Sequence, residues 1–354
     1  MDRQKVLVIV GPTSSGKSGL AVELAKELDG EVISADSRQV YRGLDIGSGK
    51  ITKQEMKGVP HHLLDIASPR GQFTVAKYKK LAQKKIREIT ERGHLPIICG
   101  GTGLYIQAAL NELSLPAIPP NLELRKELER WRATKLFKKL QVLDPARVKN
   151  IDKHNPRRLI RAIEIASATR TSNPPKDSPS AEGESLGGQI FDTFWIGLNP
   201  GKQILQEKIN KRLQQRLRRG LTTEVKNLHA KQKISWQRLD DFGLEYRYVA
   251  DFLRKQQNNS QREKISLLRK LEITNWQYAK RQMTWFKRDS QIQWMRDEHP
   301  SSSSGQVAKM MPQIKTWRSR RKQYNTDTKR QLQNPGDREN RASQQSREPG
   351  ERAK

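Results

Sequence analysis

Eight consecutive residues near the start of the chain have the types and spacing of a loop that binds phosphate groups. In order they are Gly11, Pro12, Thr13, Ser14, Ser15, Gly16, Lys17 and Ser18. Glycines let backbone N–H groups curl around phosphate oxygens, and a helix that begins here adds about half a positive charge at its N-terminus. We expect Lys17 to meet the terminal phosphate and Ser18 to approach Mg²⁺. The alternative is an ordinary glycine-rich turn between a strand and a helix.

The segments on either side support the first interpretation. Residues 5–10 form a continuous apolar, β-branched run, which is typical of a strand covered on both faces in a parallel sheet. From Lys17 to Leu28, apolar residues recur at helical spacing. The loop therefore stands between a strand and a helix, and this context predicts a di- or triphosphate ligand. It does not identify the reaction, because kinases, nucleotidases and transferases share such loops.

Further strands, predicted at residues 31–34, 95–100 and 191–198, alternate with helical segments. This alternation predicts an α/β fold, a P-loop core with a doubly wound parallel sheet. Asp36 follows one of these strands, and ligands of open α/β sheets bind beyond the carboxyl ends of the strands. Asp36 can be a metal-supporting carboxylate, a general base or a helix cap. We favour a base or a group that orients the acceptor.

Changes in composition divide the chain into four parts. Residues 1–113 form the first part of the core, and residues 114–188 form a charged helical insertion that ends in an exposed loop. Residues 189–298 return to the core through a strand and basic helices. Residues 299–354 contain few apolar residues, so we predict a disordered basic tail. The tail either adds nonspecific electrostatic affinity, in which case its removal weakens tRNA binding, or adds nothing.

Charge points to a polyanionic partner. Among 354 residues, 68 Lys and Arg outnumber 38 Asp and Glu. Such an excess attracts nucleic acid, although a basic exterior can also serve solubility alone. Cys99 is the only cysteine, which excludes an internal disulfide and favours a buried thiol. No apolar run is long enough for a membrane span. We therefore expect a cytoplasmic monomer that binds RNA and no membrane.

An ordered series of motifs covers almost all of residues 5–295. After the loop at residues 11–18 come Ile33-Ser-Ala-Asp-Ser-Arg-Gln-Val-Tyr41, Leu44-Asp-Ile-Gly47, His61-His-Leu-Leu-Asp65, Gly100-Gly-Thr-Gly-Leu-Tyr105, Arg157-Arg-Leu-Ile-Arg-Ala162 and Tyr278-Ala-Lys-Arg-Gln-Met-Thr-Trp-Phe286. This series resembles the bacterial tRNA dimethylallyltransferases, also called tRNA isopentenyl transferases. Residues 242–247 depart from the pattern of many members of that family.

The resemblance implies transfer of a dimethylallyl group from dimethylallyl diphosphate to N6 of adenosine 37, next to the anticodon in the tRNA anticodon stem-loop. The loop then holds departing pyrophosphate, with Mg²⁺ as the cofactor. Asp36, Lys17 and Thr102 are the implied catalytic residues, and Arg212 is a further candidate for the donor phosphates. The implied tRNA contacts are Asp36, Ser37, Arg38, Gln39, Thr102, Arg125, Arg157, Arg158, Leu159, Ile160 and Arg161.

Several alternatives remain open at this stage. The arginines at 157, 158 and 161 can form a solvated helix face instead of an RNA-binding patch. The aromatic residues Tyr278, Trp285 and Phe286 are expected in the core more than against RNA bases. The rival functions are a prenyltransferase for free adenylate, a small-molecule kinase with the same loop, and a noncatalytic RNA-binding protein that retains a relic loop.

Overall fold

The computed structural model describes residues 3–113, 116, 118–171, 191–255, 260–296 and 303–320. Its centre is a six-stranded sheet with the strand order β3-β2-β4-β1-β5-β6. The strands are β1 (Gln4–Val10), β2 (Gly30–Ser34), β3 (His61–His62), β4 (Leu95–Gly100), β5 (Phe191–Asn199) and β6 (Ile292–Arg296). All neighbours pair in parallel, with β1 between β4 and β5. The α/β prediction with a parallel sheet is therefore confirmed.

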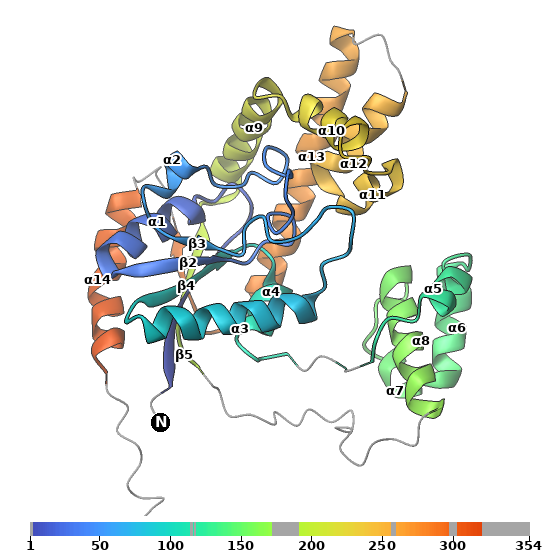
Figure 1. Ribbon diagram of the computed structural model, residues 1–354, viewed down its shortest axis with the longest axis horizontal. Helices are drawn as coiled ribbons and strands as arrows, with labels where there is room; N and C mark the ends of the chain where they lie inside the picture. Colours follow the sequence, from blue (N-terminus) through green and yellow to red (C-terminus); the bar gives the residue numbers. More distant parts are fainter. Residues whose placement is uncertain are drawn as a thin grey trace, which may run out of the picture.

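Helices cover both faces of this sheet (Figure 1). They are α1 (Lys17–Leu28), α2 (Lys53–Met56), α3 (Val75–Glu91), α4 (Gly103–Ala109), α5 (Leu122–Leu128), α6 (Ala133–Leu143), α7 (Pro145–Val148), α8 (Pro156–Thr171), α9 (Lys202–Arg218), α10 (Leu221–Ala230), α11 (Trp236–Phe242), α12 (Leu244–Arg254), α13 (Gln261–Phe286) and α14 (Ser303–Ser319). Alternate residues of β1 enter different apolar clusters: Val6 and Val8 face one, and Leu7 and Ile9 face the other. This two-sided burial explains the continuous apolar run in the sequence. None of the described helices is long and apolar enough to cross a membrane.

The predicted disordered tail was wrong for residues 303–320. Helix α14 lies beside α1 (Figure 1), and its buried residues Val307, Met310, Ile314 and Trp317 join the apolar cluster on that face. The side chain of Lys5 donates hydrogen bonds to three carbonyl oxygens at the end of α14, including that of Trp317 at 2.5 Å. Helix α14 is thus part of the core. Residues 321–354 lie outside the described part of the chain.

Strand β6 is a second difference from the prediction, which gave residues 189–298 one strand followed by basic helices. Ile292–Arg296 instead pairs in parallel with β5 at the edge of the sheet. Ile292 is buried, which anchors the strand on the sheet. A strand of five residues directly after a long helix gives too little alternation to be separated from it.

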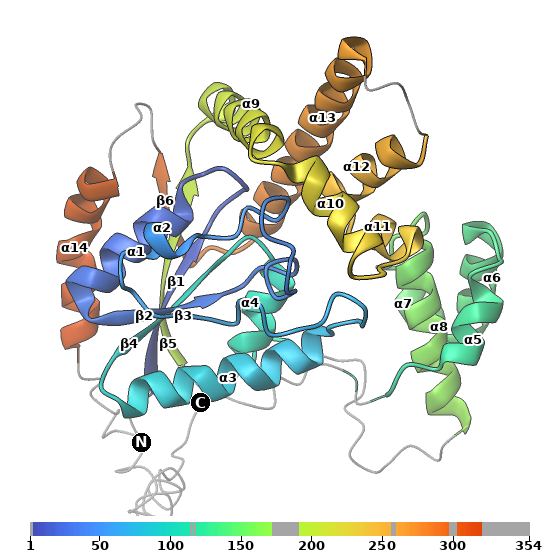
Figure 2. The same cartoon turned by 45° about the horizontal axis from the view of Figure 1, so that its top comes forward.

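Helices α5 to α8 form the predicted insertion, which Figure 2 shows beside the sheet and its helices. These helices have an apolar cluster of their own, in which Leu128, Leu136, Leu140, Leu159 and Ile163 are buried. Across to α11, Arg157 Nη2 lies 2.6 Å from Asp241 Oδ1. The exposed loop predicted at the end of the insertion falls mostly on residues 172–190, which lie outside the described part of the chain.

Candidate active site

The loop at residues 11–18 joins β1 to α1, as its spacing predicts. Gly11 has a φ of 152°, and a Cβ there would lie 2.9 Å from both Leu198 O and Ser15 Oγ. Gly16, with a φ of 96°, is the N-cap of α1. Such backbone conformations favour glycine, and successive N–H groups in turns of this kind form concave sites that bind anions.

Lys17 folds back over this loop, and its Nζ donates to Pro12 O at 3.1 Å. Burial lowers the pKa of Lys17 from the ordinary lysine value. Close by, Ser15 Oγ is buried and has no hydrogen-bond partner within the described residues. The loop therefore combines a buried cation with an unused hydroxyl, a pairing suited to an anionic ligand.

Asp36 and Thr102 follow two other strands, β2 and β4. Asp36 Oδ1 accepts hydrogen bonds from the backbone N–H groups of Arg38, at 2.8 Å, and Gln39, at 3.4 Å. Thr102 Oγ1 accepts from Ser37 N at 3.2 Å. Asp36 therefore orders the turn that follows it. The cap interpretation assumed a helix there, whereas residues 37–40 form a turn. Asp36 also lines the same cavity as Lys17, as expected of a base or an orienting group.

Two cavities meet at this point. The first contains the loop residues Thr13, Lys17 and Ser18 on one side and Asp36 on another. The second, of about 710 Å³, shares Ser18 and Arg212 with the first. The loop thus lies between an inner space, which Lys17 and Asp36 line, and a larger outer space, which Ser18 also lines.

Two arginines of α9 bring positive charge to the junction. Arg212, predicted to contact the donor phosphates, donates to Gly49 O at 3.2 Å, and burial lowers its pKa to about 10. Arg216, which sequence reasoning missed, forms a buried ion pair with Glu245. Its Nε is buried without a partner among the described residues. Arg216 therefore has an unused donor beside the predicted phosphate site.

The loop that carries Gly49 is held by Glu224 of α10. The carboxylate accepts from three successive backbone N–H groups, Asp45 at 3.1 Å, Ile46 at 2.6 Å and Gly47 at 3.0 Å. The hydroxyl of Tyr246 also donates to it, at 2.9 Å. Glu224 thereby fixes the loop whose Gly49 carbonyl contacts Arg212. No sequence pattern had marked this residue.

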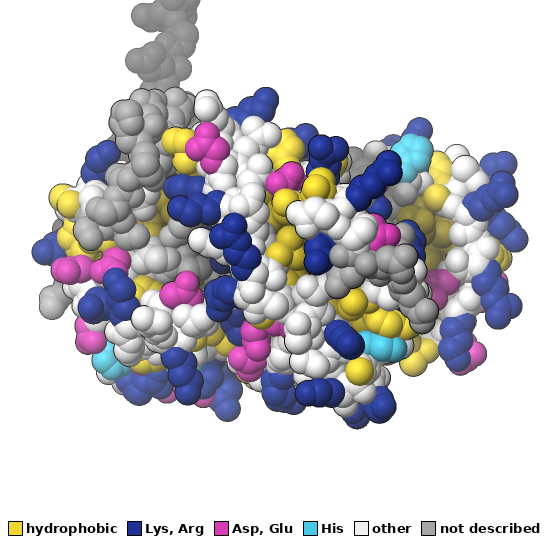
Figure 3. All heavy atoms as spheres, turned by 90° about the horizontal axis from the view of Figure 1, so that it is seen from above, with side chains coloured by type: hydrophobic (Ala, Val, Ile, Leu, Met, Phe, Trp, Pro, Cys, Tyr) yellow, Lys and Arg dark blue, Asp and Glu magenta, His cyan; other side chains and the backbone are white. Residues whose placement is uncertain are grey.

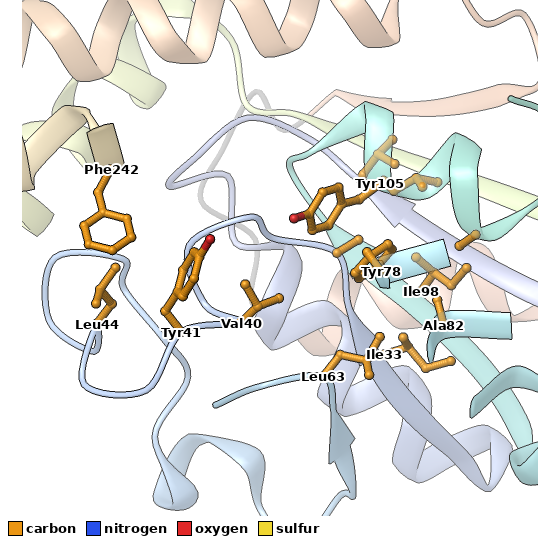
Figure 4. Close-up of a cluster of buried hydrophobic side chains, with 14 of the residues drawn as sticks. Ile33, Val40, Tyr41, Leu44, Leu63, Tyr78, Ala82, Ile98, Tyr105 and Phe242 are labelled. Atoms are coloured by element: carbon orange, nitrogen blue, oxygen red, sulfur yellow. The ribbon is translucent and has the colours of Figure 1, made fainter. Parts of the chain in front are cut away.

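Apolar contacts anchor the same loop nearer its start. Figure 4 shows Tyr41 and Leu44 beside Phe242, the last residue of α11. The rings of Tyr41 and Phe242 meet edge to face, with centroids 5.1 Å apart. Tyr78 and Tyr105 stack in the same cluster, with centroids 4.1 Å apart. The turn after Asp36 is therefore fixed by packing as well as by hydrogen bonds.

Helix α13 forms part of the wall of the inner cavity. Tyr278 lines the inner cavity, and burial raises its pKa well above the ordinary tyrosine value. Phe286 is buried in the core, as predicted, and Trp285 packs against that core next to Gly103. Gln282, which sequence reasoning did not single out, contacts the phosphate loop directly. Cys99 is buried, which raises its pKa to about 11 and makes it the expected inert thiol.

The predicted tRNA contacts of the insertion have partners within the protein. Arg125 and Arg161 both bind the buried carboxylate of Glu164. Leu159 and Ile160 are buried, while Arg158 is exposed. Arg157, also exposed, pairs with Asp241. Contact between these residues and tRNA stays a prediction.

Comparison with known proteins tests the family resemblance that the motifs predict. A family model described as IPP transferase matches residues 39–289. The chain belongs to the IPP transferase family. This confirms the resemblance predicted from the motifs.

Individual members of the IPP transferase family align over most of the chain. The tRNA dimethylallyltransferase of Anoxybacillus flavithermus is 38% identical over 293 residues, which span 82% of this chain and 90% of that protein. The Bacillus mycoides tRNA dimethylallyltransferase is 39% identical over 306 residues, or 83% of this chain and 90% of its own length.

Solved structures agree. The full-length tRNA isopentenylpyrophosphate transferase of Bacillus halodurans has a TM-score of 0.64 at 35% identity, covering 89% of this chain and 97% of that one. A eukaryotic dimethylallyltransferase acting on tRNA shares the fold, with a TM-score of 0.70 at 23% identity over 91% of this chain and 81% of that one.

Proposed function

We propose that this chain transfers a dimethylallyl group from dimethylallyl diphosphate to N6 of adenosine 37 in tRNA and releases pyrophosphate, acting as a monomer. The observation that carries the proposal is one cavity that contains both the phosphate loop with Lys17 and the carboxylate of Asp36. Family membership supports the same reaction class, since the aligned bacterial relatives are named tRNA dimethylallyltransferases.

The donor side of the site suits a diphosphate leaving group. The loop offers backbone N–H groups and Lys17, and α9 adds Arg212 and the unpartnered Nε of Arg216. These groups stabilise the negative charge that grows on the diphosphate as its C–O bond breaks. The buried hydroxyl of Ser15 is an additional unused donor. In the proposed reaction the loop therefore serves departure of pyrophosphate.

On the acceptor side, Asp36 takes the proton that N6 loses as the new N–C bond forms. Hydrogen bonds from Arg38 N and Gln39 N hold the carboxylate in place while it does so. Thr102 acts through the same turn, because its hydroxyl accepts from Ser37 N. One carboxylate thus receives the proton while the loop receives the leaving group.

Mg²⁺ fits this site through Ser18. A hydroxyl at this position of a phosphate loop, together with phosphate oxygens and water, is a common arrangement for that ion. Ser18 lines both cavities at the loop, so its side chain lies where donor phosphates would bind. Bound there, the ion would neutralise charge on the diphosphate.

The acceptor adenosine must leave its base stack in the tRNA to reach this site. Unstacking costs a few kcal/mol and is easiest in a single-stranded loop. Positive side chains offset this cost by contacting the RNA backbone. Figure 3 shows Lys and Arg side chains across one face of the molecule, from the core to the insertion. This distribution supports a large polyanionic acceptor over free adenylate.

A transfer assay tests the proposal against the adenylate prenyltransferase. The chain is incubated with Mg²⁺, labelled dimethylallyl diphosphate and either tRNA or free AMP, and the products are digested and analysed for N6-dimethylallyladenosine. Label in tRNA alone is the expected result. Label in AMP alone would indicate an adenylate prenyltransferase. Absence of transfer to either acceptor would reject both.

A further inference from the structure

Gln282 is a buried polar residue in the middle of the last motif of the series, and no role in the reaction has accounted for it so far. Its side chain lies in α13 with 6% of its surface exposed. Oε1 accepts a hydrogen bond from Thr13 N at 2.8 Å, and Nε2 donates one to Gly101 O at 2.8 Å. A single carboxamide therefore links two backbone segments that are far apart in the sequence.

The two hydrogen bonds require both halves of the amide. The Thr13 N–H can only donate and the Gly101 carbonyl can only accept, so the group between them must accept at one atom and donate at the other. An ionised carboxylate has no donor for Gly101, and a thioether offers no N–H or O–H donor at all. Space is equally restricted, because a Cβ on Gly101 would lie 2.1 Å from Gln282 Nε2.

The linked segments belong to opposite halves of the site. Thr13 is part of the phosphate loop, whereas Gly101 immediately precedes Thr102. Thr102 Oγ1 in turn accepts from Ser37 N, next to Asp36. Gln282 is thus the hydrogen-bonded connection between the loop that faces the donor and the turn that faces the acceptor.

We propose that Gln282 is a positioning residue that fixes the separation between the phosphate loop and the Thr102–Asp36 side of the site. This inference rests on the proposed prenyl transfer. Displacement needs the reacting carbon and nitrogen about 3–3.5 Å apart and aligned, and a misplacement of about 1 Å can cost about 100-fold in rate. Each substrate has its own binding groups, so loss of the link affects the reacting geometry more than either affinity.

The test compares Gln282→Met and Gln282→Glu with Gln277→Met. Gln277 lies on the same helix with its side chain exposed, so it is a matched control for the same chemical change. For each variant, kcat and the KM for dimethylallyl diphosphate and for tRNA are measured with Mg²⁺ present. We expect kcat to fall about 10- to 100-fold in both Gln282 variants while both KM values stay within about threefold. Gln277→Met should match the wild type.

The contact between Gln282 and Gly101 is checked separately by a double-mutant cycle, in which the thermal midpoint of unfolding is measured. Gly101→Ala should lower the midpoint strongly in the wild-type background and much less with Gln282→Ala, because the shorter side chain leaves room for the new methyl group. Additive effects would overturn the contact.

The two proposals fail in different ways. If the wild type transfers the prenyl group and Gln282→Met keeps its kcat, the positioning role is wrong and the proposed function stands. A rise in the donor KM with unchanged kcat would likewise overturn positioning and assign Gln282 to donor binding. A wild type that transfers nothing overturns both proposals.

Discussion

Replacement of Ile314 by alanine tests whether α14 is an integral part of the core. Ile314 is 0% exposed in the apolar cluster that α14 shares with α1 and the sheet. Truncation of a buried isoleucine to alanine removes apolar contacts and leaves a cavity, which costs about 2–5 kcal/mol. Because no part of this side chain reaches solvent, we expect a loss within that range. The free energy of unfolding is measured by urea denaturation, with the slope of the transition monitored for two-state behaviour.

Lys315→Ala is the matched control, since Lys315 is the next residue of the same helix and its side chain is exposed. Its effect should stay within about 0.5 kcal/mol, as for most surface substitutions. An Ile314→Ala protein as stable as the control would show that α14 does not dock in solution, and the disorder predicted from composition would then apply to it.

Four further predictions address the site and the tail. Asp36→Asn should leave pyrophosphate binding intact and lower turnover by about 100- to 10,000-fold, and near-normal turnover would reduce Asp36 to a structural cap. Glu224→Ala leaves three loop N–H groups without their acceptor, so we expect the free energy of unfolding, measured by urea denaturation, to fall by about 1–3 kcal/mol and the donor KM to rise. An unchanged KM would show that the loop does not contribute to donor binding. Calorimetric affinity for pyrophosphate should begin to decrease with rising pH below the ordinary lysine range, because burial lowers the pKa of Lys17; Lys17→Ala should show a smaller decrease, confined to the range near the Arg212 pKa of about 10, and an unchanged decrease would exclude Lys17. A chain ending after Arg320 keeps α14 and loses nine basic and five acidic residues, so its tRNA affinity should show a weaker salt dependence, and an identical salt dependence would exclude a role for the tail.

The phosphate loop and the parallel sheet could be predicted from sequence because their signals are local. The loop has fixed spacing, and the strand and helix on either side of it have their own periodicity. Helix α14 also carried a local signal, since residues 307, 310, 314 and 317 are three or four positions apart. That stripe lies in a polar segment, and averaging the composition over the whole tail concealed it.

Glu224 and Gln282 could not be predicted in the same way. Their backbone partners lie between 177 and 269 residues away, and only the fold brings them together. The arginines of the insertion show the reverse problem. Their spacing was visible, but the ion pair of Arg125 with the buried carboxylate of Glu164 depends on how α5 and α8 pack. Arg161 reaches the same carboxylate from within α8.

The central position of β1 determines the order in which the molecule can be completed during synthesis. Val8 pairs with Ile98 on one side and with Trp195 on the other, so the first strand made keeps an open edge until β5 has emerged from the ribosome. The hydrogen bond from Lys5 to the carbonyl oxygen of Trp317 can form only later, when the end of α14 has been made. The insertion, with its own apolar cluster, is made in between and can fold while that edge is open. Closure of the sheet is therefore a late, long-range event, and such contacts slow folding.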